Sequence, residues 1–415
     1  MIQRPRGTRD FLPVEMARRR HYEGNLREVA SRFGFQEVAT PIFETSELFT
    51  MKSGPNIIDE IYVFTDKGGR EMALRPELTA AVIRMFVNEM SNEPRPLKLF
   101  YFGQCFRYER PQSGRYREFF QFGAELIGNA NPESDAEIIA LAKAMIESLG
   151  LSDYRIRIGH IGVLRQCLRD SGISDRDMPI ILQKLDKKNY SEARPLLLER
   201  GVSEKDISDI EAMTGTIGGP EVLEQLQNEA GDYLRKMMVI LDALGVKDIS
   251  IDLGVVRGLD YYTGMVFEVE APVLGAEKQI CGGGSYSLSE LFGGEKVFST
   301  GFAIGFDRIL LALEKEGKVC NIETLDAYVI PVSDEVRVEA FQILTLLRNH
   351  GLRADIDLMQ RKTGKALKHA SSLGVAKAII VGKMELEQGG VTVRDMLTGA
   401  QGMIPLTLLA ESIRD

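Results

Sequence analysis

The sequence has 415 residues, of which 44% are hydrophobic and 27% are charged. This composition is typical of a soluble globular protein, and the length predicts two or three domains because a single core rarely grows that large. The formal net charge of -9 argues against indiscriminate nucleic-acid binding, since phosphate contacts need lysine and arginine, so we expect any contact with RNA to be local.

No apolar run is long enough to span a bilayer, and residues 1–7 do not open a signal-peptide core, so the sequence predicts a cytoplasmic protein with no membrane association. The four cysteines are widely spaced, form no Cys-x-x-Cys pair and lie near no histidine cluster; they are Cys105, Cys167, Cys281 and Cys320. This spacing supports neither a zinc site nor a disulfide framework, and we expect reduced thiols.

The chain opens with a turn-rich segment over residues 7–13 and a charged amphipathic helix over 14–33 that Gly34 ends. A strand over 35–41 follows. A helix that ends at a glycine and is followed by a strand occurs in many folds, so the pattern alone is weak evidence for any particular fold.

Short strands are predicted over residues 62–64 and 72–74, and Arg75-Pro76-Glu77-Leu78-Thr79 then opens a helix. Proline at the first helical position and an acid in the first turn fit the chemistry of a helix start. On this interpretation Glu77 compensates the helix dipole and has no further role.

Residues 100–128 predict a β-hairpin with a long polar loop, because two apolar runs flank Pro111-Gln112-Ser113-Gly114-Arg115. Four arginines lie within this hairpin, at positions 107, 110, 115 and 117. Some of them can point at one anionic ligand, since strand side chains alternate between faces. The alternative is a solvated hairpin whose charges protect an exposed edge.

The next segments alternate in type. Asn131 caps a helix that ends near Leu149, a strand follows over residues 154–158, and residues 164–245 show helical periodicity without strand signals. Strands return over 249–253 and 265–270, and a glycine-rich turn over 280–286 lets backbone approach a ligand. Residues 300–308 predict a strand that leads into a helix.

Beyond residue 325 strands alternate with helices, which predicts a small parallel or mixed α/β sheet. This segment, residues 326–415, has 11 basic and 11 acidic residues, so the acidic excess of the chain lies upstream of it. The difference in charge supports a separate C-terminal module.

Several of these segments resemble signatures of the histidyl-tRNA synthetase family. Residues 106–125 resemble the second motif of class II aminoacyl-tRNA synthetases in its histidyl form, and residues 300–308 resemble the third motif. The helix and strand that end at Pro41 resemble the first motif. Arg257-Gly258-Leu259-Asp260-Tyr261-Tyr262 resembles the string that separates histidyl enzymes from other class II synthetases.

The resemblance implies an α+β catalytic domain of class II type, with an antiparallel sheet and helices, a helical insertion and a C-terminal α/β anticodon-binding domain. It divides the chain into a first catalytic part (1–163), the insertion (164–246), a second catalytic part (247–322) and the anticodon-binding domain (326–415). It also implies a homodimer that forms through the region near Pro41.

The implied activity is the ligation of L-histidine to tRNA(His), with ATP and Mg2+ as cofactors. Arg107 and Arg257 match the family's catalytic arginines at the α-phosphate. Histidine binding is implied for Glu77, Leu78, Thr79, Arg107, Gln121, Glu125, Arg257, Tyr261, Tyr262 and Tyr286. ATP binding is implied for Arg107, Glu109, Arg115, Phe119 and Arg308, and the metal ligands stay unassigned.

The sequence departs from the family pattern at three positions. Ser285 and Ser287 stand where arginine and aspartate are usual, which puts the usual contacts of those positions in doubt. Asp307 replaces the more usual glutamate and is one methylene shorter.

Two alternatives stay open. A regulatory relative of ATP phosphoribosyltransferase generally lacks the C-terminal domain and loses motif arginines, whereas both are present here. A class II synthetase for glycine, threonine or proline shares the C-terminal module, but the string at 257–262 argues against it.

Overall fold

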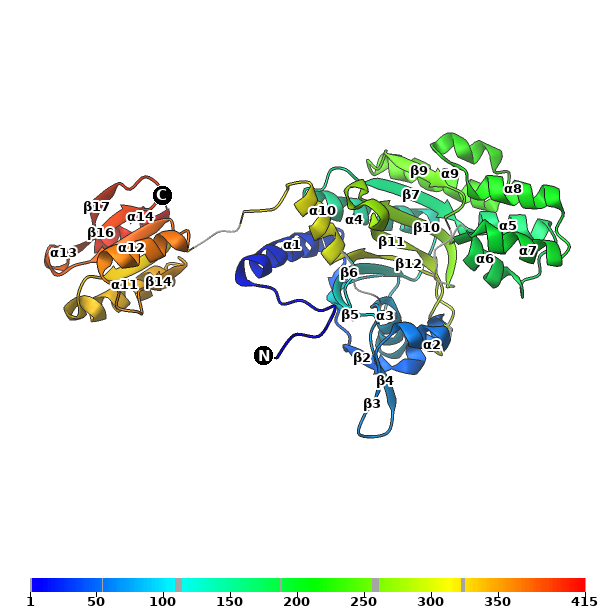
Figure 1. Ribbon diagram of the computed structural model, residues 1–415. Coiled ribbons are helices and arrows are strands. Elements are labelled where there is room, and N and C mark those ends of the chain that lie inside the picture. The colour runs from blue at the N-terminus through cyan, green and yellow to red at the C-terminus, as the bar shows by residue number, and fades with distance from the viewer. Residues whose placement is uncertain are drawn as a thin grey trace. The chain divides into compact units, whose positions relative to one another are not determined.

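The structure is a computed structural model that describes residues 2–53, 55–108, 114–186, 189–255, 261–321 and 325–414. The chain divides into two compact units, Met1–Cys320 and Asn321–Asp415 (Figure 1). The finer division of the first unit into two catalytic parts and an insertion stays a prediction.

A mostly antiparallel sheet organises the first unit. Within the described residues it has nine strands, in the order β1 (Gln36–Glu37), β5 (Leu97–Phe106), β6 (Glu118–Ile127), β12 (Ser299–Gly305), β11 (Gln279–Tyr286), β10 (Tyr262–Glu270), β7 (Arg155–His160), β9 (Ile249–Asp252) and β8 (Ile217–Gly218). The pairs β1–β5 and β7–β9 are parallel. The predicted hairpin is confirmed, because β5 and β6 pair antiparallel along their whole length.

One face of this sheet is covered by long helices (Figure 1). They are α1 (Pro13–Arg32), α4 (Pro132–Ser148), α9 (Glu229–Ala243) and α10 (Phe306–Lys315). Phe122, Ala124 and Leu126 of β6 are buried in the core beneath them. Because strand side chains alternate, the odd-numbered residues of β6 are left for the opposite face.

The opposite face meets shorter elements. These are α2 (Ser46–Ser53), α3 (Thr79–Met85), a small sheet of β2 (Phe43–Thr45), β4 (Glu71–Leu74) and β3 (Val63–Thr65), and the helices α5 (Ile161–Asp170), α6 (Met178–Asp186), α7 (Tyr190–Glu199) and α8 (Glu204–Thr214). Helix α5 packs on β10. Short helical turns are η1 (Pro55–Glu60), η2 (Phe86–Met90), η3 (Pro220–Gln225) and η4 (Pro272–Glu277).

The second unit has the predicted mixed sheet. In the described residues its strands run in the order β14 (Ala354–Ile356), β13 (Ala327–Pro331), β15 (Lys377–Val381), β16 (Gly390–Asp395) and β17 (Gln401–Pro405). Its helices are α11 (Arg337–Asn349), α12 (Thr363–Ser372), α13 (Lys383–Glu387) and α14 (Leu409–Arg414), with turns η5 (Asp334–Val336) and η6 (Leu406–Leu408). The two last strands were not predicted.

The glycine-rich turn predicted over residues 280–286 is wrong, because these residues form the central strand β11. Here the glycines make room for neighbouring strands. A β-carbon on Gly283 would lie 2.2 Å from the Gly301 carbonyl oxygen, and one on Gly284 would lie 2.4 Å from that of Met265. Glycine in a strand often marks this kind of close backbone approach.

Three boundaries also differ from prediction. Helix α3 begins at Thr79, so Pro76 and Glu77 precede the helix and do not form its first turn. Strand β1 is only two residues long, and the helical stretch after residue 164 contains the short strand β8, which pairs with β9. In each case sheet pairing or loop packing, which local periodicity does not record, decides the boundary.

Asp307 joins three parts of the first unit. Its side chain is 2% exposed, and its Oδ1 accepts from Arg19 Nη1 at 2.8 Å and from Arg9 Nη2. Its Oδ2 accepts from the backbone N–H of Phe120 at 2.7 Å. The shorter aspartate therefore has partners on both oxygens, and the departure at this position leaves no unpaired carboxylate.

We predict that Arg19→Met destabilises the first unit by about 3 kcal/mol, because it breaks a buried ion pair and leaves the Asp307 charge with one cation. Urea unfolding followed by circular dichroism measures this. Arg20→Met is the matched control: the Arg20 side chain is 67% exposed, so the expected change is at most about 0.5 kcal/mol. Equal midpoints for the two variants would contradict the prediction.

Candidate active site

A pocket of about 280 Å³ opens over strands β6, β11 and β12. Most of the predicted site residues line it: Glu77, Thr79, Arg107, Arg115, Phe119, Gln121, Glu125, Tyr261, Tyr262, Tyr286 and Arg308. Leu78 is buried in the adjacent core and is not among the lining residues. Glu109 and Arg257 lie outside the residues that the structure describes.

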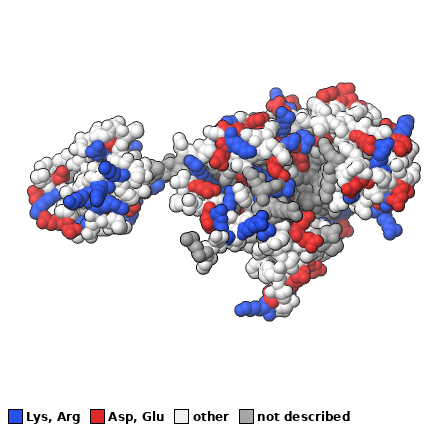
Figure 2. Space-filling model, in the orientation of Figure 1, with Lys and Arg blue, Asp and Glu red and all other residues white. Residues whose placement is uncertain are grey.

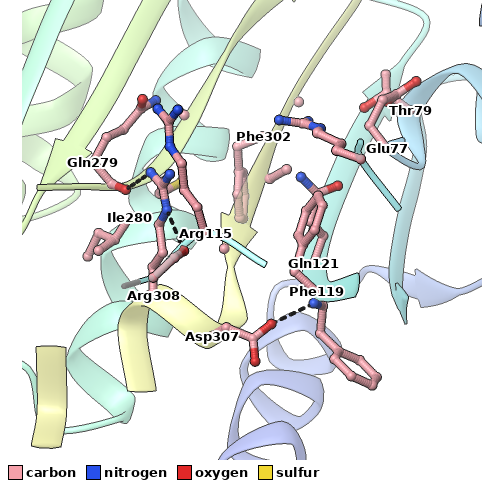
Figure 3. A pocket seen from close by; sticks show the side chains of 18 of the residues that line it. Glu77, Thr79, Arg115, Phe119, Gln121, Gln279, Ile280, Phe302, Asp307 and Arg308 are labelled. Atoms are coloured by element: carbon pink, nitrogen blue, oxygen red, sulfur yellow. Dashed lines mark hydrogen bonds between the residues drawn. The ribbon is translucent and has the colours of Figure 1, made fainter. Parts of the chain in front are cut away.

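The pocket has two chemically different ends. Figure 3 shows Glu77 and Thr79 on one side and Arg115 with Arg308 on the other, with Gln121 between them. Acidic groups at one end and guanidinium groups at the other suit a ligand, or a pair of ligands, with a cationic part and an anionic part.

Glu125 lies at the floor of the pocket and is 1% exposed. Its Oε1 accepts from the Tyr101 hydroxyl at 2.7 Å, and its Oε2 accepts from the Tyr286 hydroxyl at 2.6 Å. Burial raises the pKa of Glu125 to about 7, although both tyrosine hydroxyls act in the opposite direction. This carboxylate therefore changes charge near neutral pH.

Two glycines make this arrangement possible. Gly123 faces Tyr101 across the β5–β6 pair, and a β-carbon there would lie 2.4 Å from the tyrosine ring. Gly301 faces Glu125 across the β6–β12 pair, and a β-carbon there would lie 1.7 Å from Glu125 Oε2. Both glycines leave the space that the buried polar side chains occupy.

Glu77 lies just before helix α3, and its Oε1 accepts from the Ala80 N–H at 3.1 Å. The same oxygen is 3.0 Å from Lys52 Nζ. Burial alone would raise the pKa of Glu77, but the charge and hydrogen bond of Lys52, with the Ala80 and Thr79 amides, hold that pKa below its ordinary value. Glu77 is thus a fixed anion at the wall of the pocket.

The arginine end is held by carbonyl and carboxylate groups. Arg107 contacts the other end, because its Nε donates at 3.1 Å to the carbonyl of Pro76, the residue before Glu77. Arg308 Nη1 donates to the Gln279 carbonyl at 2.9 Å, and its Nη2 lies 3.2 Å from Glu277 Oε2. The same Glu277 oxygen is 2.8 Å from Arg115 Nε, so one carboxylate holds both arginines.

Ser285 and Ser287, which differ from the family pattern, lie away from the pocket. The Ser285 Oγ donates to Asp135 at 2.7 Å, in a buried cluster that includes the Tyr233 hydroxyl. The Ser287 Oγ donates to the Val297 carbonyl at 3.3 Å. Neither serine is among the residues that line the pocket, so in this structure the two departures remove nothing from its wall.

Sequence reasoning missed three residues: Lys52, Tyr101 and Glu277. Tyr101 gives a usable signal, because a tyrosine in a strand opposite a glycine has room to lie across that glycine. Lys52 and Glu277 give no such signal in the sequence. Each lies outside the motifs and meets its partners only because separate segments of the chain pack together.

Across the described residues, no helix is both long and apolar enough to cross a membrane. The same residues contain no group of three or more His, Cys, Asp or Glu side chains arranged to hold a metal ion. The cysteines are present as free thiols, and Cys105 and Cys281 are buried.

Solved structures with the same architecture define the class of this protein. Apo histidyl-tRNA synthetase of S. aureus superposes with a TM-score of 0.76 at 32% identity and covers 100% of both chains. A chain from Bacillus halodurans, described as an ATP phosphoribosyltransferase regulatory subunit/histidyl-tRNA synthetase, has a TM-score of 0.79 at 26% identity and covers 92% of this chain and 99% of its own. The fold is that of a class II aminoacyl-tRNA synthetase.

Sequence comparison narrows the class to one family. The family model for histidyl-tRNA synthetase matches residues 7–309, and the anticodon-binding domain model matches residues 326–415. The histidine–tRNA ligase of Methanosarcina acetivorans is 45% identical over 99% of this chain and 98% of its own length. The chain belongs to the histidyl-tRNA synthetase family.

We predict that Gly301→Ala destabilises the first unit by about 2–4 kcal/mol, because the new methyl group would collide with the paired Glu125 carboxylate and with the Ala124 carbonyl, 2.6 Å away. Urea unfolding tests this. Gly24→Ala in helix α1 is the control, since nothing lies within 4 Å of the place that its new methyl group would take; it should stabilise by about 0.5–1 kcal/mol. A neutral Gly301→Ala would show that Glu125 moves freely.

Proposed function

We propose that this chain activates L-histidine with ATP, releases pyrophosphate, and transfers the histidyl group to the 3′ end of tRNA(His). The observation that supports this most directly is the pocket itself. It combines a fixed anion (Glu77), a buried carboxylate bound by two tyrosines (Glu125) and a pair of arginines (Arg115 and Arg308) in one cavity.

The amino-acid end suits histidine. Glu77, with Thr79 and Gln121, provides acceptors for an α-ammonium group. Glu125 accepts a hydrogen bond from an imidazole N–H, and Tyr261, Tyr262 and Tyr286 supply the surrounding rings and hydroxyls. An amino acid without the imidazole could not supply the additional N–H donor to Glu125, which disfavours it by up to about 10⁴–10⁵ in kcat/KM.

The arginine end suits the phosphates of ATP. A carboxylate oxygen of histidine forms a bond to the α-phosphorus while the bond to pyrophosphate breaks, and negative charge builds on the phosphoryl oxygens. Fixed guanidinium groups stabilise this charge more in the transition state than in the ground state. We assign this role to Arg107 and, by family resemblance, to Arg257; Arg115, Phe119, Arg308 and Glu109 belong to the ATP site on the same basis.

Magnesium, when bound, would neutralise part of the negative charge of the ATP phosphates. Glu277, which pairs with Arg115 and Arg308, is one described carboxylate near this end that could help to hold the ion.

Contacts with tRNA and with a second subunit complete the proposal. Basic side chains gather over α12 of the C-terminal unit (Figure 2), where Lys362, Lys365 and Lys368 are exposed, and such groups meet phosphates. The homodimer through the region near Pro41 is supported by the exposed side chains of Ile42 and Phe43, and light scattering in solution tests it.

The activation step is tested by ATP–pyrophosphate exchange against a panel of amino acids. We expect exchange with histidine alone, reduced by about 10²–10³ in Arg107→Ala, because one donor to the transition state is lost. Arg20→Met, on the exposed face of α1, should keep the wild-type rate. Exchange with another amino acid would reassign the substrate, and no exchange with any amino acid would favour a regulatory relative.

We predict a pH dependence that depends on Glu125. With its pKa at about 7, this carboxyl is ionised above that value and protonated below it, and only the ionised form has all its lone pairs available to N–H and O–H donors. The KM for histidine of wild type divided by that of Glu125→Gln should therefore rise as the pH falls from about 8 to about 6. The ionisation of free histidine in solution is the same in both assays, so a flat ratio would contradict the prediction.

A further inference from the structure

Lys52 is a buried cation at the pocket wall that belongs to none of the family motifs. It lies in the last turn of α2, and its side chain is 2% exposed. Its Nζ is 3.0 Å from Glu77 Oε1 and 4.4 Å from the centroid of the Tyr261 ring. A buried lysine is costly unless it is paired, and here a carboxylate and an aromatic face both pair with it.

Lys52 lies on the inner side of Glu77, away from solvent. The Glu77 side chain is 17% exposed, against 2% for Lys52, so the lysine is the more enclosed of the two. Among the described residues, Oε1 receives both Lys52 and the Ala80 N–H at 3.1 Å, whereas Oε2 has the longer contact with the same N–H, at 3.4 Å. The Glu77 carboxylate is thus anchored by Lys52 and the Ala80 amide, while its side chain stays 17% exposed.

We propose that Lys52 is a positioning residue for amino-acid recognition: it holds Glu77 ionised and in one orientation, so that the carboxylate meets the α-ammonium group of the substrate. This rests on the role of Glu77 in the proposed function. Lys52 also lies against Tyr261, and so it couples the ammonium end of the pocket to the ring cluster. A buried carboxyl without this cation is favoured in its neutral form, which attracts an ammonium group only weakly.

The decisive variant is Lys52→Met in the full-length protein, assayed by histidine-dependent ATP–pyrophosphate exchange. The KM for histidine should rise by about 10- to 100-fold, since truncating one partner of a buried charge pair leaves the other unpaired. The KM for ATP and kcat should stay within about twofold. Lys52→Arg, which keeps a cation, should recover part of the lost affinity.

Measuring the KM for histidine as a function of pH distinguishes a positioning role of Lys52 from a merely structural one. Without Lys52 the pKa of Glu77 moves up, so the carboxyl is ionised at high pH and neutral at low pH. The KM ratio of Lys52→Met to wild type should therefore grow as the pH falls. Lys52→Gln, which keeps a donor but loses the charge, should show the same trend and serves if the methionine variant unfolds.

The matched control is Lys98→Met. Lys98 also forms one ion pair with a glutamate, Glu137, at 2.6 Å, but it is not among the residues that line the pocket; its variant should keep the wild-type KM for histidine at every pH. An unchanged KM in Lys52→Met, or a loss that is independent of pH and shared by kcat and the KM for ATP, would overturn the proposal. Absence of histidine-dependent exchange in wild type would instead overturn the proposed function.

Discussion

The buried carboxylate of Asp307 is the constraint on which the rest of this site depends. A charge that is 2% exposed needs partners, and it finds them in Arg9 and Arg19 of the N-terminal region and in the Phe120 amide of β6. Figure 3 shows this contact between Asp307 and β6 at one edge of the pocket. Since Arg308 follows Asp307, and Phe119 and Gln121 flank Phe120, the contacts of this one carboxylate fix how three pocket residues are presented.

A second buried carboxylate, Glu125, explains two of the glycines in the central strands, Gly123 and Gly301. Tyr101 and Tyr286 must reach the two oxygens of Glu125 from neighbouring strands, and side chains on Gly123 or Gly301 would occupy the space they need. The glycines are therefore a consequence of burying a polar cluster in a sheet, where strand neighbours lie about 4.7–4.9 Å apart. The same small residues that allow the strands to pack closely also leave room for the hydrogen bonds of Glu125.

Much of this architecture could be predicted from sequence because it follows local patterns. The β5–β6 hairpin, the cap of α4 at Asn131 and the alternating elements after residue 325 all agree with the structure. The strand β11 was mistaken for a turn because glycine is locally a turn former, whereas its strand state comes from pairing on both sides. Lys52 and Tyr101 were missed for a related reason: the partners of a buried polar group are set by tertiary contacts, which leave no periodic signal in the chain.

Both ends of the pocket are neutralised by the chain's own side chains, but in different ways. At the arginine end the counter-ion is Glu277, which is 29% exposed and shares one oxygen between Arg115 and Arg308; a phosphate group at those arginines competes with a carboxylate that water can readily solvate. At the opposite end the counter-ion is the enclosed Lys52, and water cannot replace its partner so easily. Because a buried ion pair is costly to break and an exposed one is not, the end of the pocket with Glu77 is the more rigid of the two. The ion pairs of Arg115 and Arg308 are the ones that a bound anion displaces more readily.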